Sequence, residues 1–421
     1  MEERNEGAWL LSHAKKLDGA TGVHRFEKIH YAGRIGRLLN ILRRETSGKF
    51  TVSVSSEIVT SLCQLNNIDL PTRREGLRVL QDLGLVDVSQ SGGVDVLGAT
   101  TETVLKSTSQ IFQSLNPTGG ETGIVEVSEK ISASPQAEEL IIEQISDEQR
   151  LTKKDAANLI AVANDASLID REEYKGSKIL FSQNVFRSAN KARKIYLLLQ
   201  SRSTLEQNLI NEAVEKVRAK GAVHEEEVKK ILGVDLLRTL ISLGFFDRME
   251  VNNEAEAAGY LACPDAFQRF GSSFQEDPVD DAKALLASLT YGMSRSSYAR
   301  GQITLPTKLL NKLVEGGEVG DDRPVRAIGE DYREVERRGV IQVIPHGRDR
   351  FSMKLLKRDV GELARAIIKG QSAAEEALLM SFKPANQFTS PEENRIKVRK
   401  NKTVSDQKFV NDALDAIRSG F

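Results

Sequence analysis

The sequence has few cysteines and no long apolar run, and each shortage excludes a class of protein. Only two cysteines, Cys63 and Cys263, occur in 421 residues, and they form no CxxC pair. This excludes a disulfide framework and a thiolate metal site, and it fits a reducing compartment. No run of about 18 apolar residues could span a bilayer, and the N-terminus lacks the basic-then-apolar order of a signal peptide. We therefore expect a cytoplasmic protein with no membrane partner.

Motifs for catalysis or metal binding are also missing. The five histidines include no HExxH sequence and no pair at positions i and i+4. The segment TSGKF at 46–50 lacks both the upstream glycine of a phosphate loop and the Ser or Thr after the lysine, so we interpret it as a turn. No nucleophile elbow or glycine-rich dinucleotide fingerprint occurs. We expect no enzyme, no cofactor and no metal.

What is present is a globular composition with segregated charge. With 40% hydrophobic and 28% charged residues, the chain can form two to four compact domains. Its formal net charge is only -1, yet residues 24–44 carry six Lys/Arg against one acid, and residues 121–149 carry eight acids against one lysine. Distinct basic and acidic surfaces are one interpretation, and ordinary charged helix faces are the other.

A unit of helices followed by a hairpin recurs four times. In each copy an amphipathic helix ends, a hydrophobic pair begins a strand, a polar loop follows and a second strand returns. The junction residue, where a helix end favours a left-handed conformation, is glycine in three copies and Ser167 in the second. In the first copy we expect helices at 35–44, 55–67 and 71–83. The four hairpin segments are 79–98, 161–183, 239–264 and 334–356.

Three helices followed by a two-stranded hairpin resemble the winged helix, a helix-turn-helix variant whose third helix usually reads DNA and whose hairpin is the wing. The resemblance covers most of residues 24–370 and rests on fold-level patterns. It implies an α+β protein, mainly α with small β-hairpins, built of tandem winged-helix-like units. The expected division is a first unit at 1–115, a linker at 116–123, further units at 124–186, 187–275 and 276–382, and a basic tail with a terminal helix at 383–421.

Candidate DNA contacts lie on two of the third helices and on the fourth hairpin. In the expected helix 71–83, Leu77, Leu80 and Leu83 would be buried, leaving arginines and a glutamine in solvent. Arginine suits guanine or phosphate, and glutamine suits adenine. In the expected helix 324–338 the arginines lie among acids, which weakens that case. The predicted contacts are Arg73, Arg74, Arg78, Gln81, Arg326, Arg333, Arg337, Arg348 and Arg350.

Two functions fit these patterns. The first is a non-enzymatic DNA-binding protein that holds duplex DNA through basic helices and wings. The alternative is a scaffold or adaptor subunit of a larger DNA-handling or defence-type complex, in which winged helices bind protein. The third hairpin favours the scaffold, because Glu250, Glu254 and Glu256 would repel phosphates. A protein partner or self-association is expected in either case, and the amphipathic segment 404–421 could dock on a partner or fold back on the chain.

Overall fold

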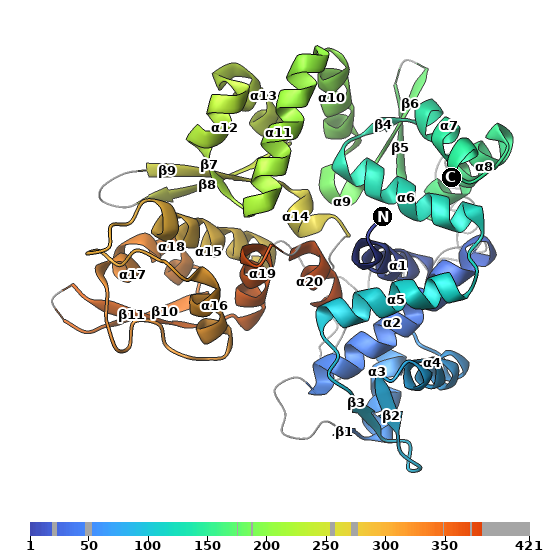
Figure 1. The fold of residues 1–421 in the computed structure, drawn as a ribbon, viewed down its shortest axis with the longest axis horizontal. Helices are drawn as coiled ribbons and strands as arrows, with labels where there is room; N and C mark the ends of the chain where they lie inside the picture. Colours follow the sequence, from blue (N-terminus) through green and yellow to red (C-terminus); the bar gives the residue numbers. More distant parts are fainter. Residues whose placement is uncertain are drawn as a thin grey trace, which may run out of the picture.

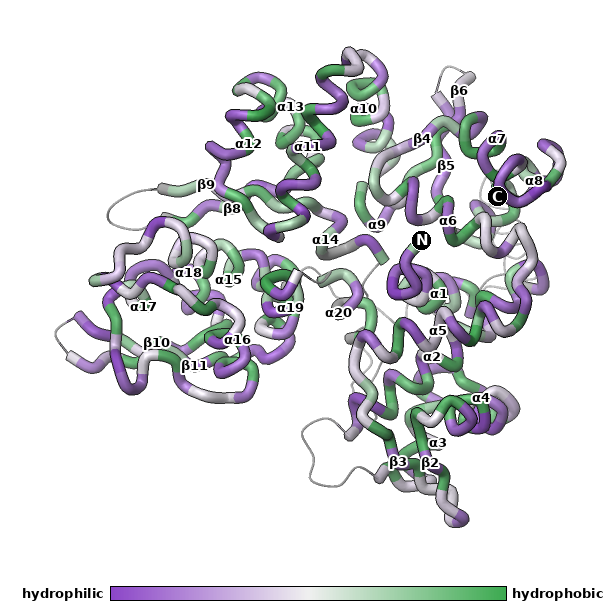
Figure 2. Tube along the Cα trace, in the orientation of Figure 1, coloured by the Kyte–Doolittle hydropathy of each residue, from purple (hydrophilic) through white to green (hydrophobic). Residues whose placement is uncertain are grey.

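The computed structural model describes residues 1–18, 23–46, 53–174, 176–186, 188–252, 257–270, 277–347, 349–370 and 373–380. Within these ranges the chain is mainly helical and has four small antiparallel sheets of two or three strands (Figure 1). This confirms the expected α+β class. Hydrophobic and hydrophilic segments alternate along the helices in Figure 2, as expected for helices that bury one face. No described helix is both long and apolar enough to cross a membrane.

The first unit has the expected helices and hairpin, together with an additional long helix at each end. Its elements are α1 (Glu3–Leu17), η1 (Val23–Phe26), α2 (Glu27–Thr46), β1 (Ser53–Val54), α3 (Ser56–Leu65), α4 (Leu70–Asp82), β2 (Val86–Val88), β3 (Val94–Val96) and α5 (Thr101–Ser114). Both α1 and α5 pack along α2. They therefore add to the group of α2, α3 and α4, the three helices that precede the hairpin.

The second and third units repeat this order. The second has α6 (Gly119–Ala133), β4 (Gln136–Ala137), α7 (Glu138–Glu148), α8 (Lys153–Asp165), β5 (Asp170–Tyr174), β6 (Ser177–Phe181) and α9 (Gln183–Phe186). The third has α10 (Ala189–Gln200), α11 (Thr204–Lys220), β7 (Val223–His224), α12 (Glu225–Leu232), α13 (Val234–Leu243), β8 (Asp247–Asn252), β9 (Ala257–Ala262) and α14 (Asp265–Gln268).

A short third strand completes the sheet in each of these units. It precedes the second helix and pairs with the returning hairpin strand, which gives the orders β1-β3-β2, β4-β6-β5 and β7-β9-β8. Sequence patterns did not predict these strands, because each has two residues and two residues show no alternation. Their partners lie some 40 residues further along the chain, so only the tertiary fold reveals them.

The fourth unit departs from this topology. Its elements are α15 (Asp277–Ser294), α16 (Pro306–Val314), α17 (Arg326–Asp331), α18 (Arg333–Arg337), β10 (Ile341–Pro345), β11 (Phe351–Leu355), α19 (Arg358–Ile368) and α20 (Ala373–Met380). Isolated bridges from Val319 and Val325 to β11 take the place of the third strand. The single helix expected at 324–338 is two short helices, because Tyr332 leaves helical geometry at φ -111° and ψ 11°.

The expected linker at 116–123 is mostly helix. From Gly119 onward it belongs to α6, which begins with a capping box: the Glu121 backbone N–H donates to Thr118 Oγ1 at 3.2 Å, and the Thr118 N–H donates to the Glu121 carboxylate at 3.0 Å. Glu121 is buried and also accepts the backbone N–H of Lys28 in α2 at 2.8 Å. The sequence contains this signal, since Thr-x-x-Glu is typical of a helix start, but the adjacent Pro117, Gly119 and Gly120 are equally typical of a turn.

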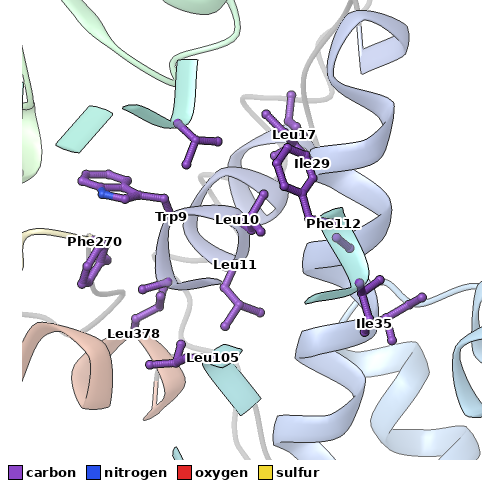
Figure 3. Packing of buried hydrophobic residues seen from close by; sticks show 14 of the residues in the cluster. Trp9, Leu10, Leu11, Leu17, Ile29, Ile35, Leu105, Phe112, Phe270 and Leu378 are labelled. Carbon is purple, nitrogen blue, oxygen red and sulfur yellow. The ribbon is translucent and has the colours of Figure 1, made fainter. Parts of the chain in front are cut away.

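Segments of the later units reach the core of the first. One cluster of buried apolar side chains runs from Ala8 through the first two units to Leu180, and it includes Phe270, which follows α14, and Leu378 in α20. Trp9 of α1 lies at the meeting point, with its ring centroid 4.9 Å from that of Phe270 at 74° (Figure 3). In Figure 1, α14 and α20 accordingly lie between the first two units and the last two.

A chain of hydrogen bonds crosses the same junction. Glu129 of α6 accepts from Trp9 Nε1 at 2.7 Å and from Arg269 Nη1 at 2.9 Å. The other end of the Arg269 guanidinium donates to Asp265 at 2.7 Å, and Asp265 also accepts from Arg218 of α11 at 2.8 Å. Burial opposes the charge of Arg269, but Asp265 and Glu129 outweigh it and raise the pKa of the guanidinium. Together these five residues, which we call the junction network, connect the first three units.

Ser167 takes the position that glycine has in the other units, and its φ of +58° is left-handed like the +68° of Gly84. A side chain in this conformation costs about 1–2 kcal/mol, partly offset by the freedom glycine loses on folding. We expect Ser167→Gly to raise the free energy of unfolding by roughly 0.5–1 kcal/mol in urea denaturation. Gly84→Ser is the control: nothing lies within 4 Å of its Cβ position, so strain alone should lower stability. An unchanged stability in both variants would refute this explanation.

His13 should make the protein sensitive to acid. Its ring is fully buried on α1, with Nε2 2.9 Å from Ser128 Oγ of α6. Burial, and then the charge of Lys16, lower its pKa well below 6.5. The unfolded chain therefore takes up a proton below about pH 6.5 that the folded chain excludes. Hence the free energy of unfolding should fall by up to about 1.4 kcal/mol per pH unit as the pH drops below that value.

Urea denaturation at pH 7 and at acid pH measures this slope. The variant His13→Gln should flatten it, because the titrating group is gone, whereas His24→Gln, at an exposed position, should leave it unchanged. A slope that persists in His13→Gln would assign the acid sensitivity to other groups.

Candidate nucleic-acid interface

The helix α4 is held firmly at its start and along one side. The Asp69 side chain accepts the Thr72 backbone N–H at 2.8 Å and so caps the first turn. Gly76 and Leu80 are buried, and a Cβ at Gly76 would lie 3.2 Å from a methyl of Leu38 on α2. This close approach fixes which face of α4 is turned to solvent.

The burial expected along α4 is confirmed for Leu80 and wrong for Leu83. Leu77 is partly buried, but Leu83 is 43% exposed. It is the C-cap residue, beyond the last turn that packs on α2. Gly76 is part of the buried face instead. A pattern of apolar side chains does not mark it, but its lack of a side chain lets α4 approach α2 closely.

The candidate contacts on α4 separate into one structural and three exposed side chains. Arg73 donates from Nη1 to Thr60 Oγ1 of α3 at 2.6 Å, so it holds α3 and α4 together. Arg74, Arg78 and Gln81 are exposed and lie at i, i+4 and i+7 on one edge of the helix. Neither Arg74 nor Arg78 forms a hydrogen bond or ion pair with the described residues, and Gln81 makes only a 3.4 Å contact with Asp87.

The three candidate arginines on α17 and α18 already have partners within the fourth unit. Arg326 donates to Glu330 at 2.5 Å, and Arg337 lies 3.4 Å from Glu334. Arg333 donates to the Gly329 carbonyl at 3.3 Å. The acids that weakened this helix in the sequence do pair with its arginines, so the charges of α17 and α18 largely cancel.

The fourth hairpin has the predicted strands and a turn closed by its own backbone. The His346 N–H donates to the Arg350 carbonyl at 2.8 Å, and Gly347 at the turn has φ +80°. Arg350 is exposed, and its Nη1 contacts the Pro324 carbonyl at 3.4 Å. Arg348 lies outside the described residues. Below the turn, Glu318 pairs with Lys354 at 3.2 Å, so this side of the hairpin carries little net charge.

The third hairpin is less repulsive to phosphate than its sequence indicates. Glu250 pairs with Arg248 at 2.7 Å, and the same guanidinium contacts Glu225 at 2.7 Å. The hydrogen bonds that Arg248 donates to Glu250 and Glu225 raise the pKa of its guanidinium. Glu254 and Glu256 lie outside the described residues. The charge of Arg248 is therefore already neutralised by Glu250 and Glu225, so these three residues offer no free cation to DNA.

The described residues offer little for catalysis or metal binding. They contain no group of three or more His, Cys, Asp or Glu side chains that could hold a metal ion. Both cysteines are buried, and burial raises the pKa of the Cys63 thiol to about 11. A cleft of about 460 Å³ between η1, α2 and α6 is lined by His24, Arg25 and Lys28, but also by Glu27 and Glu121, which would repel an anion.

Comparison with protein-family models, with curated proteins and with solved structures gives no match. The surfaces of the chain itself must therefore indicate its function. Of the predicted contacts, the structure brings Arg74, Arg78 and Gln81 together on one exposed face, which we call the α4 basic edge.

The division between Arg73 and Arg74 can be tested by stability. Arg73→Ala removes the hydrogen bond between α4 and Thr60 of α3, whose hydroxyl still donates to the Ser56 carbonyl at 2.7 Å, and should lower the free energy of unfolding by about 1 kcal/mol. Arg74→Ala removes a side chain with no described partner and should change it by less than about 0.5 kcal/mol. Thermal or urea unfolding of the two variants measures both effects. Equal losses would mean that Arg74 has a structural role as well.

Proposed function

We propose that the protein is a non-enzymatic DNA-binding protein that holds duplex DNA through the α4 basic edge. The observation that carries this proposal is the pair of exposed arginines, Arg74 and Arg78, which have no partner among the described residues, while the predicted contacts on α17 and α18 are occupied. A guanidinium that donates no hydrogen bonds within the protein has all its N–H groups available to guanine or phosphate.

The geometry of α4 supports this proposal. From Arg74 to Gln81 the helix advances about 10 Å, which matches three base-pair steps of a duplex. The opposite face is anchored by Gly76 and Leu80, so a docked helix would not need to reorganise. In the resemblance to a winged helix, α4 is the third helix, the one that enters the major groove.

Two arginines make a modest electrostatic contribution. If each neutralises one phosphate, the logarithm of the binding constant should fall with the logarithm of salt concentration with a slope of about -2 from this edge. The near-neutral net charge of the chain, -1, adds no general attraction. We therefore propose binding that positions the protein on DNA with limited base readout by Gln81 and the arginines.

A scaffold function is favoured by a different observation on the same unit. Apolar side chains at Ile58, Leu65, Leu83 and Leu97 are all more than a third exposed. Apolar groups near a third helix could dock against protein instead of DNA. The two functions are separated by the charge reversals below, which alter the arginines and leave the apolar side chains in place.

Reversing the α4 basic edge should weaken duplex binding. We expect Arg78→Glu to reduce affinity for a duplex roughly 5- to 100-fold at low salt, and Arg74→Glu with Arg78→Glu to reduce it further and flatten the salt dependence. Fluorescence anisotropy with a labelled duplex across a salt series measures both quantities.

Arg238→Glu is the matched control, because Arg238 is 76% exposed on α13, the corresponding third helix of the third unit. It should leave duplex affinity within about twofold. Equal losses from Arg78→Glu and Arg238→Glu would indicate nonspecific charge attraction. No measurable duplex binding by the unaltered protein at low salt would favour the scaffold function.

A further inference from the structure

The outer face of the first hairpin carries two aspartates and no basic side chain. Asp87 of β2 and Asp95 of β3 are directly opposite partners, so their side chains project from the same side of the sheet. Residues 83–98, which include both strands and their turn, contain no Lys, Arg or His. Like charges at directly opposite positions destabilise a sheet. The hairpin therefore bears a negative charge that its own residues do not compensate.

The described contacts do not relieve this repulsion. The Asp87 carboxylate accepts one long contact, at 3.4 Å, from the uncharged amide of Gln81. Asp95 forms no hydrogen bond or ion pair with the described residues. Lys106, the first cation after the hairpin in the sequence, already pairs with Glu102 at 2.6 Å. A cation placed on this face would therefore stabilise the folded sheet.

Apolar side chains lie beside the aspartates. Leu97 follows Asp95 by two residues, and its N–H donates to the Leu85 carbonyl at 2.9 Å, so it continues the strand on the same face. The Leu97 side chain is 52% exposed, and Leu83 at the end of α4 is 43% exposed. In Figure 1 the hairpin forms the lower end of the first unit. A ligand of this face must combine positive charge with apolar groups, which excludes the phosphate backbone of a nucleic acid.

The chain itself contains a segment of that chemistry. Residues 395–402, RIKVRKNK, which we call the basic segment, carry five Lys or Arg and no acid. Ile396 and Val398 lie between the cations and supply aliphatic side chains. The basic segment is outside the described residues. Its charge complements the two aspartates, and its aliphatic side chains suit the exposed leucines.

The described chain ends close to the hairpin. In α20 the Leu379 carbonyl accepts from Asn40 Nδ2 of α2 at 2.9 Å. Arg43, on the same helix, donates to Asn40 Oδ1 at 3.2 Å and to Thr101 Oγ1 of α5 at 2.9 Å. Thr101 follows Leu97 by four residues, which places the two at most about 14 Å apart. A short chain of contacts thus connects the end of α20 with this face.

The acidic helix α7 is a weaker match for the basic segment. Its Glu143 pairs with Lys153 at 2.8 Å, and its Glu148 pairs with Lys130 at 3.2 Å. Two of its carboxylates therefore already have cationic partners, whereas the two aspartates of the hairpin have none among the described residues.

We propose that the outer face of the first hairpin binds the chain's own basic segment, with the cations on Asp87 and Asp95 and the aliphatic side chains on Leu97. Residues 381–394 connect this segment to α20 and can extend up to about 45 Å, so one chain can make the contact by itself. A tether raises the local concentration of a ligand to the order of millimolar, and several weak surface ion pairs then suffice. The inference goes beyond the proposed function, because its surface does not include the α4 basic edge and its test needs no nucleic acid.

Energy transfer between two dyes on the full chain measures this docking. The dyes are attached at Ser91→Cys in the hairpin turn and at Ser405→Cys beyond the basic segment. Cys63 and Cys263 are 3% and 4% exposed, so they should not react. Docking should give high transfer at low salt and lower transfer as salt screens the charges.

Charge exchange identifies the two surfaces. Asp87→Lys with Asp95→Lys should lower the docking equilibrium constant roughly tenfold at low salt, and Lys397→Glu with Arg399→Glu should do the same. All four changes in one chain should restore the transfer, because the opposite charges have exchanged places.

Two further variants serve as controls. Glu139→Lys with Asp147→Lys makes the same change of charge at exposed positions of α7 and should leave the transfer unchanged. Asp87→Asn with Asp95→Asn removes the repulsion within the hairpin, so it should weaken docking by roughly 2- to 5-fold without lowering the thermal stability.

Unchanged transfer in both reversed variants would overturn this inference, as would an equal loss in the α7 control. Transfer between singly labelled chains that disappears on dilution would assign the contact to a second copy of the chain. Loss of transfer on chelation with EDTA would assign the aspartates to a metal ion. Either of these last two results also overturns docking of the segment on its own chain.

Discussion

The arrangement of the units depends on the guanidinium of Arg269, whose side chain is 16% exposed and pairs with the buried Asp265. It joins Glu129 of the second unit to Asp265 of the third, while Trp9 and Arg218 bind the same two carboxylates from the first and third units. Removing one partner of a buried ion pair typically costs several kcal/mol, because the remaining charge stays buried without compensation. Around this network Trp9 and Phe270 supply apolar contact. The polar groups therefore specify how the units are arranged, and the apolar groups stabilise the contact between them.

Units of similar topology have different surfaces, which is why the fold alone does not give the function. The third helix of the first unit leaves Arg74 and Arg78 free of described partners, whereas Lys153 on α8 pairs with Glu143. On α17, Arg326 is bound by Glu330. Charge pairing within each unit thus decides which third helix can attract phosphate, and the first unit is the strongest candidate.

Contacts of α20 also connect the fourth unit to the first. In Figure 1, α20 lies between the fourth unit and the helices of the first. Arg4 of α1 pairs with Glu375 of α20, and Asn40 of α2 donates to the Leu379 carbonyl at 2.9 Å, so the end of the fourth unit is tied to the first.

Short-range sequence signals made the helices and hairpins predictable from the sequence. Apolar spacing and glycine at helix ends act over a few residues, and they predicted the α4 helix and the fourth hairpin. Long-range contacts decided the rest. Whether an arginine is structural, like Arg73, or exposed, like Arg74, depends on Thr60 of a neighbouring helix. Periodicity carries no information about such partners, because each lies on another element whose position only the folded chain defines.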